Sequence, residues 1–376
     1  MKIAFIGQKG IPATFGGVEY HVDELSKGLV TLGYEVNVYV RNWYTEKNLH
    51  SYKGVRLIHI PTIKTKHLDA SIHSLLCSIH SIFQKSDIIH YHAIGPSFFS
   101  LIPRLFGKKI VSTVHRLDWD TEKWGKIAKT FLKIGEYIST KIPPRTIVVS
   151  EELKDYFKDK YGKETIHIPH GTDLFQPRPA GLIKQRYNLE GKDYILFMGR
   201  LVPEKRVDWL IKSFQSLNKH SSKLKNIKLV IAGGSSATDD YVQRLKELSK
   251  NDPEIIYTGF VTGIEKEELL SNALIFVLPS YLEGFPIVLL EAKSYGLCCL
   301  ASDIPPHCEA IHSGIDGLLF HSDNFSDLIL KLQTLIDDPE KVEIMGRNAR
   351  KEMKKRPSWE EVVKKTEEVY QKLLRR

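Results

Sequence analysis

The sequence predicts an α/β protein with two doubly wound domains, each a parallel sheet with helices on both faces. Short runs rich in β-branched residues alternate with helical patterns in both halves of the chain, as in βαβ units. A segment rich in Pro and turn residues, 169–179, separates the two halves. At 376 residues, the chain is also too long for one ordinary hydrophobic core.

Each half contributes its own strands, and we place the domain boundary near residue 172, which gives domains 1–171 and 172–358. In the first half we expect strands at 2–7, 36–40, 55–60, 87–91, 109–114, 146–149 and 165–168. In the second half we expect them at 194–198, 228–232, 255–258, 274–278, 298–301 and 317–320.

The composition is ordinary for a globular protein, with 42% hydrophobic and 26% charged residues. The four cysteines show neither C-x-x-C spacing nor an even framework, so we expect no disulfide and no zinc site. No run of 18 apolar residues occurs, and the first apolar run is too short for a signal peptide. We therefore expect a cytoplasmic protein.

The formal charge of +9 is concentrated in two segments, 104–145 with +6 and 351–376 with +4. Localised basic surface indicates an anionic partner. No helix-turn-helix, zinc-finger or RNP-like motif is present, so we do not expect nucleic acid. An anionic membrane face or a pyrophosphate-linked lipid fits better.

The first expected strand leads into a glycine-rich loop and then a helix at 19–32. The loop, GQKGIPATFGGVE at 7–19, is neither G-x-G-x-x-G nor a P-loop, which argues against a nicotinamide enzyme and a kinase. Gly16 and Gly17 would let the backbone approach a phosphate or a sugar closely. The alternative is an ordinary flexible turn.

His115 follows the strand at 109–114, at the sheet edge where open α/β sheets bind ligands. We predict that it contacts a transferred sugar, although a structural histidine is the alternative. Asp118 and Asp120 form a D-x-D pair that can hold a divalent metal and nucleotide phosphates. We favour two solvated loop acids, because the chain offers other phosphate anchors.

A helix at 122–141 carries an apolar stripe on one face, which we expect to pack on the domain core. The stripe consists of Ile127, Phe131, Ile134 and Ile138. The lysines of this helix are Lys123, Lys126, Lys129 and Lys133. They form either a basic rim that can face an anionic membrane leaflet or an ordinary solvated helix face.

In the second half, Arg200 and Lys205 follow a strand and can reach one anion from a single loop. The alternative is a surface charge pair, and we expect neither residue in the core. Further on, Glu283 precedes a helix for which Pro286 suits the first position, and Glu291 lies inside it. The free N–H groups of the turn at 285–288 form an anion site.

Phosphate bound beside carboxylates, which accept hydrogen bonds from hydroxyls, indicates a nucleotide sugar. A solvated helix end is the alternative. The four motifs, GGVE at 16–19, His115, G-R-x4-K at 199–205 and E-x7-E at 283–291, resemble in this order retaining glycosyltransferases of family 4. The 7–19 segment is similar to a subgroup with many presumed rhamnosyl- and other polysaccharide glycosyltransferases. Arg206 departs from the family, which usually has Gly or Asn there.

The resemblance implies a GT-B fold, with two Rossmann-like domains and a ligand cleft between them. The first domain would bind the acceptor and the second the donor, and the helix at 359–376 would pack back on the first. No metal or other cofactor is expected. The acceptor would be a saccharide or a polyprenyl-pyrophosphate-linked saccharide in bacterial surface polysaccharide synthesis, at the inner face of the plasma membrane.

The resemblance also assigns roles to residues. Arg200 and Lys205 would stabilise the leaving diphosphate, Glu283 would hold the donor sugar, and His115 would position it. Glu291 would hold the ribose, and the remaining donor contacts would be Gly16, Gly17, Phe260, Val261, Gly284, Phe285, Pro286, Ile287 and Val288. Two alternatives stay open: a nucleotide-sugar epimerase or hydrolase of the same fold, and a non-catalytic protein that binds anionic lipid.

Overall fold

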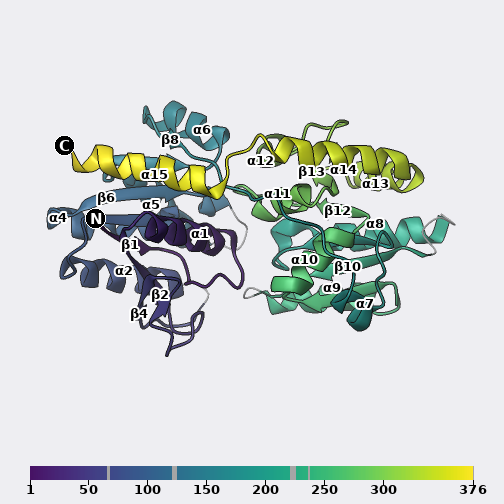
Figure 1. Cartoon of the computed structure of the whole chain (residues 1–376), viewed down its shortest axis with the longest axis horizontal. Coiled ribbons are helices and arrows are strands. Elements are labelled where there is room, and N and C mark those ends of the chain that lie inside the picture. Colours follow the sequence, from purple (N-terminus) through teal and green to yellow (C-terminus); the bar gives the residue numbers. More distant parts are fainter. Residues whose placement is uncertain (66–67, 121–124, 221–225, 236–237, 376) are drawn as a thin grey trace. The chain divides into compact units, whose positions relative to one another are not determined.

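The computed structural model describes residues 1–65, 68–120, 125–220, 226–235 and 238–375. The chain divides into two compact units. Unit 1 comprises Met1–Gly171 and Pro357–Arg376, and unit 2 comprises Thr172–Arg356 (Figure 1). Among the described residues, no helix combines the length and the apolar character that crossing a membrane requires.

Unit 1 is built on an eight-stranded sheet with the order β3-β4-β2-β1-β5-β6-β7-β8. All neighbouring strands pair in parallel except β3 and β4. The strands are β1 (Lys2–Ile6), β2 (Glu35–Arg41), β3 (Ser51–Tyr52), β4 (Val55–Ile60), β5 (Ile88–His92), β6 (Lys109–Val114), β7 (Arg145–Val148) and β8 (Ile166–His167).

The central strands of this sheet are buried on both faces. Residues 3–6 of β1 are fully buried, as are all five residues of β5. A parallel strand with helices on both sides has no solvent-facing side, so β1 is a continuous apolar run after Lys2 rather than an alternating one, whereas β5 buries His90 and His92 beside its apolar residues. β1 lies between β2 and β5, which places the topological switch point of the sheet at its carboxyl end.

The helices of unit 1 cover both faces of the sheet. They are α1 (Gly17–Thr31), α2 (Asp69–Ile82), α3 (Ile94–Ser97), α4 (Leu101–Leu105), α5 (Lys126–Lys141), α6 (Glu151–Tyr161) and α15 (Trp359–Leu374), with 3₁₀ turns η1 (Phe98–Ser100) and η2 (Asp118–Asp120).

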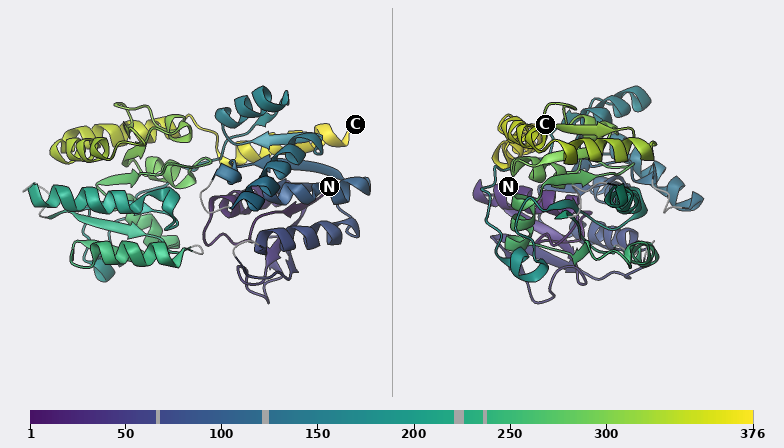
Figure 2. Two further views of the ribbon diagram at one scale, coloured as in Figure 1. Left: turned by 180° about the vertical axis from the view of Figure 1, so that it is seen from behind. Right: turned by 90° about the vertical axis from the view of Figure 1, so that its right-hand side faces the viewer.

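α15 comes from the end of the chain and packs beside α1, as Figures 1 and 2 show. Ser358 and Glu361 form a capping box at its start. Buried residues on one face of α15, including Trp359, Val363 and Tyr370, join the hydrophobic cluster that contains β1, β2 and α1 side chains. A Cβ on Gly28 would lie 2.4 Å from a Val363 methyl carbon, so α1 needs glycine at this close approach.

Unit 2 contains a six-stranded parallel sheet with the order β11-β10-β9-β12-β13-β14. The strands are β9 (Tyr194–Met198), β10 (Lys228–Ala232), β11 (Ile255–Gly259), β12 (Ile275–Leu278), β13 (Cys298–Ser302) and β14 (Gly317–Phe320). Around it lie α7 (Leu182–Tyr187), η3 (Pro203–Lys205), α8 (Val207–His220), α9 (Asp239–Ser249), α10 (Gly263–Asn272), α11 (Ile287–Ser294), α12 (Pro305–Cys308), α13 (Phe325–Asp337) and α14 (Pro339–Met353).

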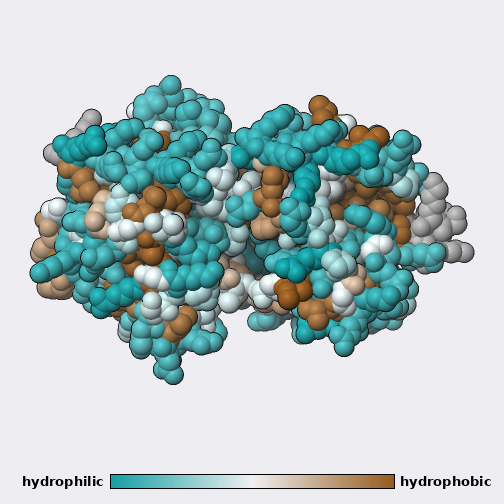
Figure 3. Space-filling view, in the orientation of Figure 1, coloured by the Kyte–Doolittle hydropathy of each residue, from teal (hydrophilic) through white to brown (hydrophobic). Residues whose placement is uncertain are grey.

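The predicted fold class is confirmed, and every strand expected from the sequence is present to within two residues. On the face drawn in Figure 3, hydrophilic side chains cover most of each unit and hydrophobic ones form separate patches. The helix expected at 122–141 begins at Lys126 in the structure, and residues 121–124, which include Lys123, lie outside the described part.

The apolar stripe expected on α5 is not the buried face of that helix. Ile127 is 89% exposed and Ile134 is 46% exposed, whereas Leu132 and Glu136 are buried. The Glu136 carboxylate accepts hydrogen bonds from four side chains, those of Trp119, Tyr156, Lys160 and Tyr161. Because these donors satisfy the buried charge, α5 turns a polar residue inward and leaves two isoleucines in solvent.

Candidate functional site

The predicted residues of unit 2 lie in loops and turns at the carboxyl edge of its sheet, except for Ile287, Val288 and Glu291, which belong to α11. Backbone hydrogen bonds join these loops: Gly199 N–H donates to Ala232 O at 2.9 Å, Gly233 N–H to Gly259 O at 2.8 Å, and Tyr281 N–H to Glu204 O at 3.0 Å. β9 lies between β10 and β12, so this edge is the topological switch point of the second sheet. The loops after β9, β10, β11 and β12 therefore form one connected set.

Lys205 and Glu283 form an ion pair within this loop set. Their side chains are 11% and 10% exposed, and Ser280 Oγ donates to the same carboxylate at 2.7 Å. Burial alone would raise the pKa of Glu283, but the Lys205 ammonium and the Ser280 hydroxyl hold that pKa below its usual value. Glu283 is therefore a buried carboxylate that stays ionised.

The expectation that Lys205 lies outside the core is wrong, since the residue is 9% exposed. Arg200, which stands in the same loop after β9, is half-buried. Arg206 follows with φ at +47°, in the left-handed region that favours Gly or Asn. Its guanidinium lies 4.3 Å from the Trp209 ring centroid and 4.9 Å from the Tyr281 ring centroid. These two cation–π contacts hold the Arg206 side chain in place.

α11 begins one residue later than predicted. Pro286 has extended backbone and caps the helix, whose first residue is Ile287. Gly284 and Phe285 precede the cap, and the buried Phe285 ring lies 5.3 Å from the Arg356 guanidinium. The N–H groups of the first turn lack intrahelical acceptors, which makes this end of α11 suited to an anion.

Glu291 lies in α11 and is 7% exposed. Lys266 of α10 donates to its Oε1 at 2.7 Å, so the carboxylate already has one cationic partner. After β11, Phe260 is 47% exposed and its ring covers Gly234, where a Cβ would approach a ring carbon to 2.7 Å. Val261 is half-buried beside it in the chain.

His307 was not predicted as part of this site. It lies in α12 after β13, is fully buried, and its Nδ1 is 3.0 Å from Ser302 Oγ. Burial lowers its pKa to about 4, although the nearby Glu283 charge opposes that shift. A histidine just after a buried strand was the available sequence signal, the same signal that selected His115.

In unit 1, the glycine-rich loop after β1 has the backbone geometry that its glycines allow. Gly16 caps α1 with φ at +104°, and Gly17 is the first residue of the helix. A Cβ on Gly16 would lie 1.8 Å from Glu19 Oε2 and would stand on a backbone with positive φ, so a larger residue would be strained and would displace the Glu19 carboxylate. Burial opposes ionisation of Glu19, but Lys9 lies near the carboxylate and holds the pKa of Glu19 below its usual value.

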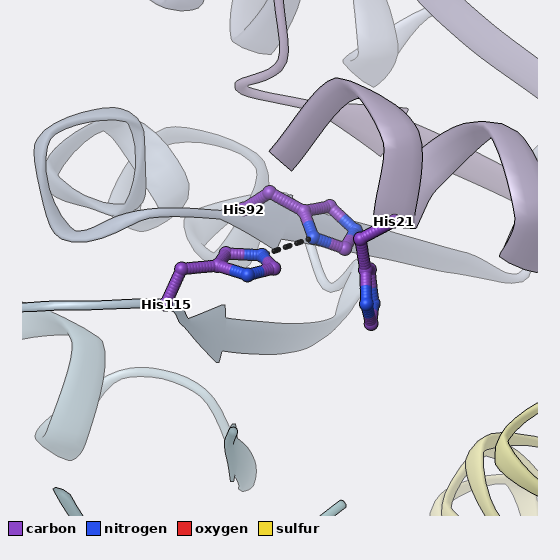
Figure 4. A group of neighbouring side chains, drawn as sticks. All are labelled: His21, His92 and His115. Carbon is purple, nitrogen blue, oxygen red and sulfur yellow. Dashed lines mark hydrogen bonds between the residues drawn. The ribbon is translucent and has the colours of Figure 1, made fainter. Parts of the chain in front are cut away.

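His115 lies just after β6 and is 5% exposed. Its Nε2 is 3.1 Å from Nδ1 of His92, the last residue of β5, and the His21 ring of α1 lies beside both (Figure 4). Among the described residues, these three histidines are the group whose geometry could hold a metal ion, with one nitrogen from each within 4.8 Å of the others. Sequence spacing did not reveal the cluster, because its members come from three separate elements.

The described atoms of Asp118 and Asp120, the alternative metal-binding pair, do not form a metal site. Asp118 accepts a hydrogen bond from Arg116 Nε at 2.8 Å, so an arginine already neutralises its charge. The side chain of Asp120 lies outside the described part of the chain.

Two family descriptions match the chain. "Glycosyltransferase Family 4" matches residues 15–175, and "Glycosyl transferases group 1" matches residues 181–352. The first match lies in unit 1 and extends over only the first four residues of unit 2, and the second match lies entirely in unit 2.

Relatives and solved structures agree with these matches. An uncharacterized glycosyltransferase of Methanocaldococcus jannaschii is 26% identical, with 98% of each chain covered. The Escherichia coli UDP-Gal:α-D-GlcNAc-diphosphoundecaprenol α-1,3-galactosyltransferase is 27% identical, with 79% of each covered. The structure of Anabaena HepE in complex with UDP-glucose superposes with a TM-score of 0.82 at 18% identity, covering 99% of this chain and 100% of that one. Glycosyltransferase families match both sheet domains, family 4 the first and group 1 the second. This chain therefore belongs to the glycosyltransferases of the GT-B fold.

Proposed function

We propose that this glycosyltransferase moves a sugar from a nucleotide diphosphate sugar to a saccharide or polyprenyl-pyrophosphate-linked acceptor, with retention of configuration. Unit 2 binds the donor and unit 1 the acceptor, and the enzyme serves bacterial surface polysaccharide synthesis. The observation that carries the proposal is the connected loop set of unit 2. It places the Lys205–Glu283 pair and the start of α11 on neighbouring strand ends.

The loop set fits a ligand that carries both phosphate and hydroxyl groups. Lys205, Arg200 and the amides at the start of α11 favour a diphosphate, whereas the ionised Glu283 accepts hydrogen bonds from sugar hydroxyls. Glu291, one helical turn into α11, holds the ribose. One protein compared above is named as a UDP-Gal-dependent galactosyltransferase and another is in complex with UDP-glucose, which supports a donor of this class.

In the proposed reaction, the bond between the anomeric carbon and the β-phosphate oxygen breaks while the acceptor oxygen bonds to the same face of that carbon. The departing phosphate oxygen takes the acceptor's proton. Lys205, Arg200 and the helix amides stabilise the charge that grows on the diphosphate, and no metal is needed for it. His115 positions the sugar.

Exposed apolar side chains in unit 1 support a lipid-linked acceptor at an anionic membrane. Phe83 at the end of α2, Leu105 and Phe106 at the end of α4, and Ile127 in α5 are between 65% and 89% exposed. α2 packs against α4, and η1 packs against both α4 and α5, so these side chains stand on neighbouring elements. Lys126 and Lys133 of α5 are exposed as well. Apolar side chains together with exposed lysines match a peripheral lipid contact.

Thermal unfolding with a panel of UDP-, GDP- and dTDP-sugars tests donor binding, and we expect a selective rise in the melting temperature with one nucleotide. NMR of the product formed with a lipid-linked acceptor then reports the anomeric configuration. Inversion would overturn the retaining mechanism, and release of free or epimerised sugar regardless of acceptor would favour the hydrolase or epimerase. A matched control is Lys246→Ala in the exposed face of α9, which should leave the shift unchanged, whereas Arg200→Ala should abolish it.

A further inference from the structure

Four buried histidines of unit 1 meet at the carboxyl edge of its sheet. His21 comes from α1, His92 ends β5, His115 follows β6 and His170 follows β8, and none is more than 5% exposed. They form two close pairs, with His92 Nδ1 at 3.1 Å from His115 Nε2 and His21 Nδ1 at 2.9 Å from His170 Nδ1. Both distances are those of hydrogen bonds in which one nitrogen carries a proton and the other a lone pair.

The cluster is uncharged at neutral pH. Burial lowers the pKa of His21 to about 3 and lowers the pKa values of His92, His115 and His170 well below their usual range, with the neighbouring imidazoles adding to the shift. A neutral imidazole carries one N–H group and one lone pair. His115 therefore cannot supply a proton as a charged acid, and its effect on a sugar depends on which nitrogen holds its proton.

The two remaining nitrogens of the His92–His115 pair decide that question. Within the described part of the chain, neither His92 Nε2 nor His115 Nδ1 has a hydrogen-bond partner. One of them must carry a proton and the other a lone pair, whichever way the shared bond runs. A buried N–H without an acceptor is rarer and more costly than an unused lone pair. Both of these nitrogens are themselves buried. Of the two rings, that of His92 is fully buried, whereas His115 retains 5% exposure, so His115 is the ring that a ligand can approach.

We propose that His92 is a positioning residue that donates from Nδ1 to His115 Nε2 and thereby fixes the His115 proton on Nδ1. From there the ring donates a hydrogen bond to a sugar hydroxyl oxygen. His92 Nε2 keeps the unused lone pair in the fully buried position. This inference rests on the proposed function and deepens it, because it names the atom of His115 that meets the sugar.

The two other histidines restrict the His115 ring. His170 stacks on it at 5.6 Å between centroids with an angle of 13° between planes, and His21 meets it edge-on at 5.0 Å. These two contacts fix the plane of the His115 ring. A 180° flip within that plane would place Cε1 where Nε2 stands and break the bond to His92, so that bond fixes which way round the ring lies.

A metal ion held by one nitrogen from each of His21, His92 and His115 is the competing use of this cluster. Binding through His92 Nδ1 and His115 Nε2 would force a proton onto the fully buried His92 Nε2. Metal-bound histidines usually donate their outer N–H to an acceptor, and none of the described residues accepts from this atom. The tautomeric arrangement avoids that buried donor.

NMR of the ¹⁵N-histidine-labelled full chain tests the tautomer directly and needs no turnover. We expect His115 to be protonated on Nδ1 and not on Nε2, unchanged between pH 7.5 and 5.5. Protonation on Nε2 would overturn the proposal, as would one equivalent of zinc found by elemental analysis of protein purified with zinc present. Failure to transfer sugar would instead sink the proposed function and leave the NMR result standing.

Two pairs of variants test the consequence for catalysis. The Asn amide nitrogen occupies about the place of histidine Nδ1, and that of Gln about the place of Nε2. We expect His115→Asn to retain about tenfold more kcat/KM than His115→Gln, and His92→Asn about tenfold more than His92→Leu. Equal losses within each pair, in variants with parental circular dichroism, would contradict the assignment. If His92→Leu fails to fold, the NMR tautomer decides.

Discussion

Replacement of Lys205 by methionine should destabilise unit 2 because it leaves the Glu283 carboxylate buried without its ammonium partner. Both side chains are about nine-tenths buried, and the hydroxyl of Ser280 also donates to this carboxylate. Removal of one partner from a buried ion pair costs about 3–5 kcal/mol. Lys205→Met should therefore lower the free energy of unfolding of unit 2 by about that amount at pH 7.

The cost should depend on pH in a defined direction. In the parent, the pKa of Glu283 is depressed, so the stability it contributes is present at neutral pH and is lost as the pH falls through that depressed value. Without Lys205, burial dominates and raises the pKa of Glu283. The carboxyl group then takes up a proton on folding at mildly acidic pH. The deficit of Lys205→Met should consequently shrink between pH 7 and pH 5.

The double variant Lys205→Met with Glu283→Gln removes both charges and keeps an acceptor for Ser280. Replacing a buried ion pair by uncharged groups is often nearly neutral, so we expect the double variant to be more stable than Lys205→Met by at least about 2 kcal/mol. Urea unfolding supplies the free energies, and hydrogen exchange of peptides from β9 and β12 assigns them to unit 2. The matched control is Lys246→Met on the exposed face of α9, expected within about 0.5 kcal/mol of the parent.

The free-energy changes of Lys205→Met and Glu283→Gln, each measured alone, should not add up to that of the double variant. Strict additivity would refute the reasoning, since it would mean that the two charges do not interact. Turnover provides a second readout. Lys205→Met and the double variant should both lose about two to three orders of magnitude in kcat/KM. The double variant regains stability, but it still lacks the lysine proposed to stabilise the diphosphate. Recovery of activity together with stability would assign Lys205 a purely structural role.

Three further predictions follow from the charges of the molecule. Sugar transfer should survive EDTA, because cationic side chains and a helix terminus replace a metal at the diphosphate; loss on chelation, restored by manganese, would instead make Asp118 and Asp120 ligands. Unit 1 should lose stability as the pH falls below about 6.5, by up to about 1.4 kcal/mol per pH unit for each buried neutral histidine such as His21, since these protonate first in the unfolded chain; a urea midpoint that stays constant from pH 7 to 5 would contradict their burial as neutral groups. At low salt, changing three lysines of α5 to Gln should weaken sedimentation of the protein with phosphatidylglycerol vesicles, whereas changing three exposed lysines of unit 2 should not. The reason is that each lysine near the membrane surface adds about 1 kcal/mol of attraction within a Debye length of about 8 Å. Equal pelleting of the two variants would remove the membrane contact from the proposal. The two sets are Lys126, Lys129 and Lys133, and Lys212, Lys246 and Lys250.

The strands were predictable because a strand buried on both faces needs a run of apolar residues, and such runs stand out between helical patterns. The loops that carry the candidate site were predictable for a related reason, since ligands of open sheets gather where these runs end. Glycine in the loop after β1 was also informative, because Gly16 adopts a positive φ that other residues rarely accept.

Pairings between distant loops were not predictable. Lys205 and Glu283 stand 78 positions apart, and nothing in the local sequence of either shows that one will be buried against the other. The burial of Glu136 likewise depends on donors from other elements, including Tyr156 and Tyr161, so the helical periodicity around Ile127 predicted the wrong face. Periodicity reports the average polarity of a face, whereas these cases are decided by individual hydrogen bonds.

Arg206 shows how a departure from a familiar pattern is accommodated. The position needs a left-handed backbone, which is why Gly or Asn suits it, and an arginine there carries a conformational cost of about 1 kcal/mol or more. Its guanidinium lies against two aromatic rings and donates to the Ser322 carbonyl. Contacts of this kind offset the backbone cost, although the residue type alone would argue against the conformation.

The packing of α15 beside α1 has a consequence for engineering. Because unit 2 is one continuous segment and unit 1 is assembled from both ends of the chain, a hybrid enzyme that exchanges unit 2 has to be made as an internal replacement of Thr172–Arg356. A simple front-to-back fusion at residue 171 would pair α1 with a foreign final helix. The close approach of Gly28 to Val363 would then depend on the side chain that the foreign helix carries at this position. Unit 2 can thus be exchanged between relatives only if each recipient keeps its own last helix.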